Sequence, residues 1–221
     1  MTIADLITAI SVALAAISFI AGVNAWNREF VGKRRIELAE IVLALFYEAQ
    51  DAIRNIRSPF SFEGEGETRK RSENEEKEQS NLLDRAFVVV ERYKNREKLF
   101  AELRSMKYRV MATFGPKAGE PFDELNQILN DIFASADILG THFWQRQGRV
   151  QMKKEEFQEH LAEMHKHESI LWFHGNEKDE ISLRVKRAVG KIESIVREAS
   201  LTKASWFSKF KKENRKSKNR A

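Results

Sequence analysis

The stretch that decides the fold is LITAISVALAAISFIAGV, which runs from Leu6 to Val23. These 18 residues carry no charge, and as an α-helix they span roughly 27 Å, close to the thickness of a bilayer's hydrocarbon core. The wider apolar run extends from about Ile3 to Trp26. We therefore predict one transmembrane helix within residues 1–27.

Two other interpretations of this stretch are a cleaved signal peptide and the core helix of a soluble domain. A signal peptide begins with positive residues, whereas the first residues here include Asp5 and neither Lys nor Arg. The length of the run and the flanking Trp26 argue against a core helix. We expect the helix to be retained as an anchor.

The residues that flank the apolar run predict its orientation. Four basic residues follow it within twelve positions, Arg28, Lys33, Arg34 and Arg35, and none precedes it. Positive charge stays on the cytoplasmic side, so we expect the N-terminus outside and the bulk of the chain in the cytoplasm, at the cell (inner) membrane. Trp26 then lies at the inner interface, where Trp26, Lys33, Arg34 and Arg35 form a membrane-surface group.

Small residues recur along one face of this helix. The set, spaced by alternating steps of four and three, is Ala4, Thr8, Ser11, Ala15, Ser18, Gly22 and Ala25. Small side chains let two helix backbones approach closely, and their 3.5-residue period is that of left-handed packing. We call this set the small-residue stripe and predict that it mediates homo-oligomerisation. The alternative is chance, because the segment is rich in small residues throughout.

Composition predicts a helical protein beyond the membrane. Charged residues make up 32% of the chain, and only 3 Pro and 10 Gly interrupt it. Cysteine is absent, which excludes disulfides, thiolate metal sites and cysteine nucleophiles. We expect an all-α protein in which the N-terminal transmembrane helix is followed by a cytoplasmic antiparallel bundle of four or five helices.

Apolar spacing and turn residues divide the chain into five parts. After the anchor (1–27), a juxtamembrane helix (28–57) continues to the break at Ser58-Pro59, and a mobile polar loop (58–79) follows. The helical bundle covers 80–200, and a basic aromatic tail covers 201–221. The bundle is expected to begin with one helix from Ser80 to about Phe114.

Three further features are expected in this bundle. Pro121 suits the first turn of the next helix, and Asp179 suits the start of the last one. Between them, a segment near 150–171 has the apolar residues Phe157, Leu161, Met164 and Leu171 at helical spacing.

The strongest candidate for a catalytic or metal centre lies in that segment. One helical face carries four potential metal ligands, Glu156, His160, Glu163 and His167. Imidazole and carboxylate groups together can bind zinc, iron or manganese. Di-iron bundles use Glu-x-x-His pairs, however, and the intervals here are Glu-x-x-x-His. A solvated polar face is the preferred interpretation. No nucleophile elbow, Walker motif or dinucleotide fingerprint occurs, so we expect no cofactor and no catalytic residue.

The C-terminal tail is strongly basic. Its 21 residues include 8 basic and one acidic side chain, a net charge of +7, with aromatic residues among them. Ammonium groups beside aromatic rings favour the surface of an anionic inner leaflet, and the group expected there is Trp206, Phe207, Lys209, Phe210, Lys211 and Lys212. Nucleic acid and a solvated tail without a partner are the alternatives.

Three functions are compatible with these patterns. The first is a non-enzymatic, membrane-anchored scaffold or regulator that self-associates and presents its bundle to a cytoplasmic protein, with Phe60 and Phe62 of the 58–79 loop as the contact. The second is a membrane-perturbing effector of a toxin or phage-defence system. The third is a metal-dependent bundle enzyme that uses the Glu156 to His167 face.

Overall fold

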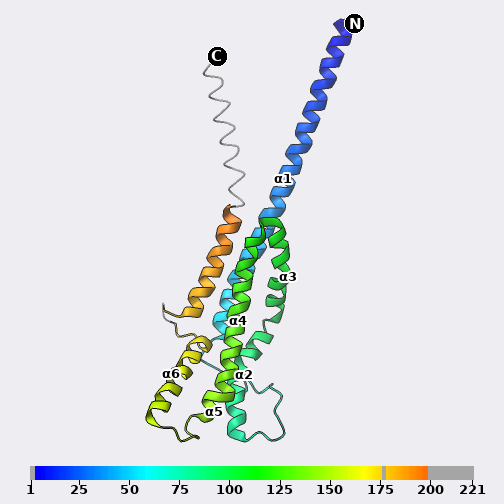
Figure 1. Cartoon of the computed structure of the whole chain (residues 1–221). Helices are drawn as coiled ribbons and strands as arrows, with labels where there is room; N and C mark the ends of the chain where they lie inside the picture. The colour runs from blue at the N-terminus through cyan, green and yellow to red at the C-terminus, as the bar shows by residue number, and fades with distance from the viewer. Residues whose placement is uncertain (1–2, 176–177, 199–221) are drawn as a thin grey trace. The chain divides into compact units, whose positions relative to one another are not determined.

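The computed structural model describes residues 3–175 and 178–198, and every regular element in these ranges is helical (Figure 1). The elements are α1 (Ile3–Ile56), α2 (Lys77–Lys94), α3 (Glu97–Phe114), the 3₁₀ turn η1 (Pro116–Gly119), α4 (Glu120–Ile138), the π-helical turn η2 (Leu139–Phe143), α5 (Trp144–Arg146), α6 (Lys154–Leu171) and a last helix over 180–198. The expected all-α class is confirmed.

The chain divides into two compact units. Of the described residues, one unit contains 3–41 and 198, and the other, unit 42–197, contains 42–175 and 178–197. The long helix α1 supplies its first part to one unit and its last turns to the other.

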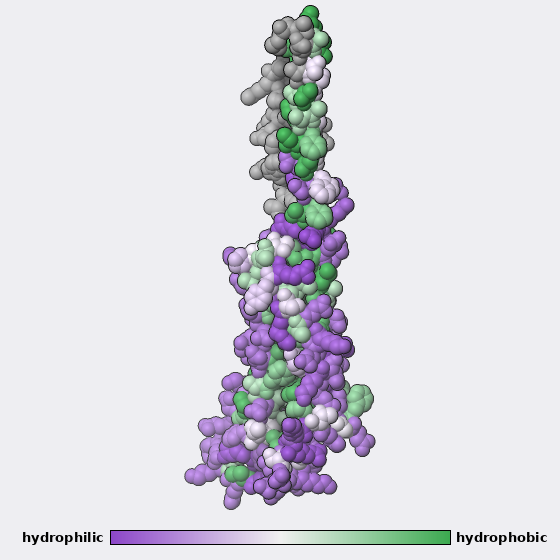
Figure 2. Space-filling model, turned by 90° about the vertical axis from the view of Figure 1, so that its right-hand side faces the viewer, coloured by the Kyte–Doolittle hydropathy of each residue, from purple (hydrophilic) through white to green (hydrophobic). Residues whose placement is uncertain are grey.

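The first part of α1 is apolar and exposed. A window of 18 residues in this helix has a mean hydropathy of 2.4, and none of the window is buried. Figure 2 shows its surface as mostly hydrophobic, while the surface of unit 42–197 is mostly hydrophilic. In the described part of the chain, α1 is the one helix that is long and apolar enough to cross a membrane.

The core of unit 42–197 forms around the last turns of α1. These turns are amphipathic, with apolar side chains on one face and polar side chains on the other. The apolar face is buried, and its fully buried side chains are Val42, Phe46, Ala49 and Ile56. The Phe46 ring meets Phe122 of α4 edge to face, with 4.8 Å between ring centroids. Burying a large apolar side chain of this kind contributes about 1.5–3 kcal/mol to stability.

The single helix expected from Ser80 to Phe114 is instead two helices. The chain breaks at Asn95 and Arg96, where the Arg96 amide donates to the Tyr93 carbonyl across a tight turn. Helices α2 and α3 both pack against α4, and α4 runs beside both in Figure 1.

Aromatic packing gives a physical reason for this break. The ring of Tyr93, at the end of α2, stacks on Phe100 of α3 and meets Phe133 of α4 edge to face, each at 5.1 Å between centroids. A periodic apolar pattern continues through the break, so the pattern alone predicted an unbroken helix.

The turn into α4 follows the sequence signals. Gly115 adopts φ of +100°, a conformation that side chains disfavour, and Pro121 lies in the first turn of α4 as expected. Past Ile138 the helix widens into η2, which carries Phe143.

Helix α6 is rotated relative to the expected apolar face. His160, Met164 and Leu171 are its buried side chains, whereas Phe157 is exposed. The imidazole of His160 packs against the Phe143 ring, at 5.2 Å between centroids. The wide turn of η2 places that ring against α6, and a polar residue therefore occupies a core position.

The last helix begins where the sequence predicted. The carboxylate of Asp179 accepts a hydrogen bond of 2.9 Å from the Ser182 amide, which caps the helix. Arg184 then joins the helix to α4 through Glu124 and Asp131, at 2.8 and 2.6 Å.

Candidate functional site: the anchored aromatic loop

The segment between α1 and α2 is irregular, but it ends three residues earlier than the predicted loop 58–79, because α2 begins at Lys77. Side-chain hydrogen bonds and ion pairs join this segment to α2. Arg92 of α2 is buried beneath it, with 7% of its surface exposed. Its guanidinium donates to the Ser58 carbonyl at 2.7 Å and to the Phe60 carbonyl, and it pairs with Glu65 at 2.6 Å. One side chain thus holds the first half of the loop in place.

A second cluster holds the other half. The Arg69 guanidinium pairs with Glu75 and with Asp84 of α2, and Arg71 reaches the same Asp84 at 2.7 Å. The hydrogen bonds from Arg69 keep the pKa of Glu75 at about 2. The loop's charged residues, which the sequence presents as a solvated run, therefore pair with one another and with α2.

Gly66 lies between the two clusters and brings the loop close to α2. Its amide donates to the Glu91 carboxylate at 2.9 Å, and its φ is +91°. A Cβ at this position would lie 2.0 Å from the Asp84 carbonyl oxygen, so only glycine allows this approach.

The fixed loop presents two aromatic side chains to solvent. Phe60 and Phe62 are 83% and 82% exposed, although the backbone at both residues is hydrogen-bonded to Arg92 or Glu65. Glu63 and Glu67 beside them are exposed too. We call residues 58–67 the aromatic loop. A contact surface held in one conformation loses little entropy on binding, and exposed aromatics are typical interface anchors.

The small-residue stripe is exposed on α1 wherever its side chains are described. The Thr8 hydroxyl donates to the Ala4 carbonyl and the Ser11 hydroxyl to the Ile7 carbonyl, both at 2.9 Å. These bonds satisfy both hydroxyls within the helix, as an apolar environment requires.

The end of the apolar run contains a cluster that the sequence analysis identified in part. The Trp26 ring stacks on Phe30 at 5.9 Å, and the Arg34 guanidinium lies 5.1 Å from the Phe30 ring centroid. Lys33 pairs with Glu29 at 3.1 Å. Phe30 was missed because it lies beyond the apolar run, although its i+4 spacing from Trp26 was a usable signal.

Three of the four residues of the candidate metal site have separate polar partners, and the fourth, His160, has a buried Nε2 with no hydrogen-bond partner among the described residues. Glu156 pairs with Arg146, Glu163 with Lys166, and the His167 Nδ1 lies 3.2 Å from the Ser135 hydroxyl. Burial lowers the pKa of His160 and of His167. In residues 3–175 and 178–198, no three His, Asp or Glu side chains are grouped in a way that could hold a metal ion.

The tail residues predicted at the membrane surface, Trp206 to Lys212, lie outside the described residues. Comparisons with protein-family models, characterised proteins and solved structures found no match for this chain.

Proposed function

We propose that this chain is a single-pass membrane protein that self-associates through α1 and presents a cytoplasmic helical bundle to a protein partner, as a non-enzymatic scaffold or regulator. The aromatic loop makes the contact. The observation that carries this proposal is the exposure of Phe60 and Phe62 on a backbone held by the buried Arg92.

The membrane part of the proposal has its own support. The exposed apolar length of α1 favours insertion, and the basic residues after Trp26 favour a cytoplasmic bulk. The basic tail adds a second contact with the anionic inner leaflet, and this contact is preferred over nucleic acid because α1 already brings the chain to the membrane.

Partner binding is tested by proximity labelling of the full chain in membranes. We expect the double substitution Phe60→Ser with Phe62→Ser to remove specific labelled proteins, because both rings are solvent-exposed and their loss leaves the core intact. The matched control is Phe157→Ser on the exposed face of α6. Identical labelling by the unmodified chain, the double variant and the Phe157→Ser control would falsify the partner contact.

Self-association is tested by cross-linking in membranes. Ser11→Leu with Ser18→Leu places bulk on the small-residue stripe and should reduce the oligomer fraction. Ile10→Leu with Ile17→Leu, on the neighbouring face, is the control and should leave it unchanged. A membrane-potential dye during the same expression separates scaffold from effector: depolarisation would indicate the effector function.

A further inference from the structure

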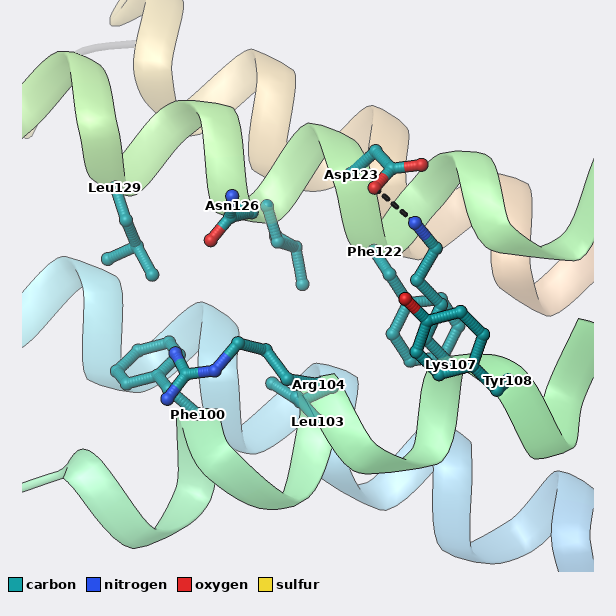
Figure 3. A pocket seen from close by; sticks show the side chains of 10 residues that line it. Phe100, Leu103, Arg104, Lys107, Tyr108, Phe122, Asp123, Asn126 and Leu129 are labelled. Atoms are coloured by element: carbon teal, nitrogen blue, oxygen red, sulfur yellow. Dashed lines mark hydrogen bonds and ion pairs between the residues drawn. The ribbon is translucent and has the colours of Figure 1, made fainter.

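A small apolar pocket lies between α3 and α4 (Figure 3). It has a volume of about 230 Å³. Its wall consists of buried apolar side chains from both helices, namely Phe100, Leu103, Phe122, Leu125 and Leu129. The two helices are held together at one end by η1, where a Cβ added to Gly119 would lie 2.8 Å from the Met111 sulfur.

The rim of this pocket is polar and carries a surplus of positive charge. Lys107 forms an ion pair with Asp123, marked by the dashed line in Figure 3. The charges of these two residues therefore cancel. Arg104 lies across the opening, and its Nη1 donates to the Tyr93 hydroxyl at 3.0 Å. None of the ion pairs among the described residues includes Arg104.

We propose that this pocket binds a small apolar carboxylate, with its hydrocarbon body against the wall and its carboxylate on Arg104. A guanidinium matches a carboxylate with two parallel hydrogen bonds, and the Asn126 amide adds a polar group at the rim. The pocket is smaller than the 300–1,000 Å³ of drug-sized sites, so a compact aromatic or short-chain acid fits, whereas a two-chain lipid does not.

The test uses the full chain in nanodiscs, titrated calorimetrically with 4-phenylbutyrate and with its neutral amide. We expect saturable one-to-one binding of the acid and binding of the amide that is weaker by roughly tenfold to hundredfold, because a hydrogen bond to a charged group contributes about 1.5–3 kcal/mol. Equal binding of the two probes, or no saturable binding of the acid, would overturn the proposal.

Two pairs of variants locate the binding. Arg104→Gln should weaken binding of the acid to the level of the amide, while Arg109→Gln, also exposed on α3, should leave it unchanged. Asn126→Trp should obstruct the opening, while Asn130→Trp, exposed one turn further along α4, should not. All four substitutions are at exposed positions, so circular dichroism should confirm an unchanged fold. Equal effects within either pair would place binding elsewhere and overturn the assignment.

Discussion

At the scale of single residues, Arg57 joins three parts of the chain. Its side chain is 1% exposed and pairs with Asp179 at 2.9 Å. The same guanidinium donates to the carbonyls of Ser169, Ile170 and Trp172, at 2.8 to 2.9 Å. The end of α1, the end of α6 and the start of the last helix therefore meet at one buried charge.

Replacing this charge should destabilise the protein strongly. Arg57→Ala leaves three backbone carbonyls without this donor and removes the cation that pairs with the buried Asp179 carboxylate, so we expect the free energy of unfolding to fall by about 3–5 kcal/mol. Chemical denaturation measures the change. Arg187→Ala, which removes an exposed pair with Glu180, is the control and should cost less than about 1 kcal/mol. Similar losses in both variants would contradict a structural role for Arg57.

Glu75 gives a pH-dependent prediction at the same scale. Arg69 lowers the pKa of Glu75 from 4.5 to about 2, so its pairing stabilises the folded loop above pH 4.5 and is lost as the pH falls towards 2. An NMR titration of the Glu75 carboxyl should show a midpoint near 2. In Arg69→Gln the midpoint should return towards 4.5, and an unchanged midpoint would disprove the assigned cause.

At the scale of elements, the π-helical turn η2 determines how α4 leads into α6. Gly140 lies in this turn against Ala86 of α2, and a Cβ at position 140 would lie 2.6 Å from the Ala86 Cβ. The turn also carries Phe143, whose ring lies against His160 and His167 of α6. One irregular turn thus contacts two helices.

Two glycine substitutions should have opposite effects on stability. Gly140→Ala forces η2 away from α2 and should lower the free energy of unfolding by about 1–3 kcal/mol. Gly190→Ala lies inside the last helix with nothing within 4 Å, and it should raise that free energy by up to about 1 kcal/mol. Thermal denaturation monitored by circular dichroism compares the two. A stabilising Gly140→Ala would show that η2 and α2 are not in tight contact.

At the scale of the whole molecule, topology is the main prediction. The chain has no cysteine, so single cysteines report position without further changes. With the N-terminus outside, a membrane-impermeant maleimide should label Thr2→Cys in intact cells, because residue 2 precedes the apolar run. Ser61→Cys, between the two exposed phenylalanines, should react only after permeabilisation. The reverse pattern would invert the proposed orientation.

The sequence anticipated elements whose signals are local. The uncharged run in α1, Pro121 in the first turn of α4 and the cap at Asp179 each depend on residues within one or two helical turns, so their physical causes are visible in the sequence. The small-residue stripe and the basic tail stay predictions for experiment.

Contacts between residues far apart in the sequence accompany two features that the sequence did not predict, the break between α2 and α3 and the burial of His160. At the break between α2 and α3, the Tyr93 ring meets Phe133, which lies 40 residues further along the chain. The buried His160 side chain of α6 likewise packs against the ring of Phe143, which belongs to η2. Residue spacing within one helix contains no information about such partners.

The sequence by itself determined the helical class and the apolar helix near the N-terminus, because helix propensity and hydrophobic length are properties of contiguous residues. Only the tertiary structure decided that residues 58–76 are fixed to α2. Whether a charged side chain is solvated or paired depends on what folds against it, and Arg92 lies 27 positions from Glu65 and 32 from Phe60. That pairing, which no local pattern reveals, leaves Phe60 and Phe62 exposed on a fixed backbone.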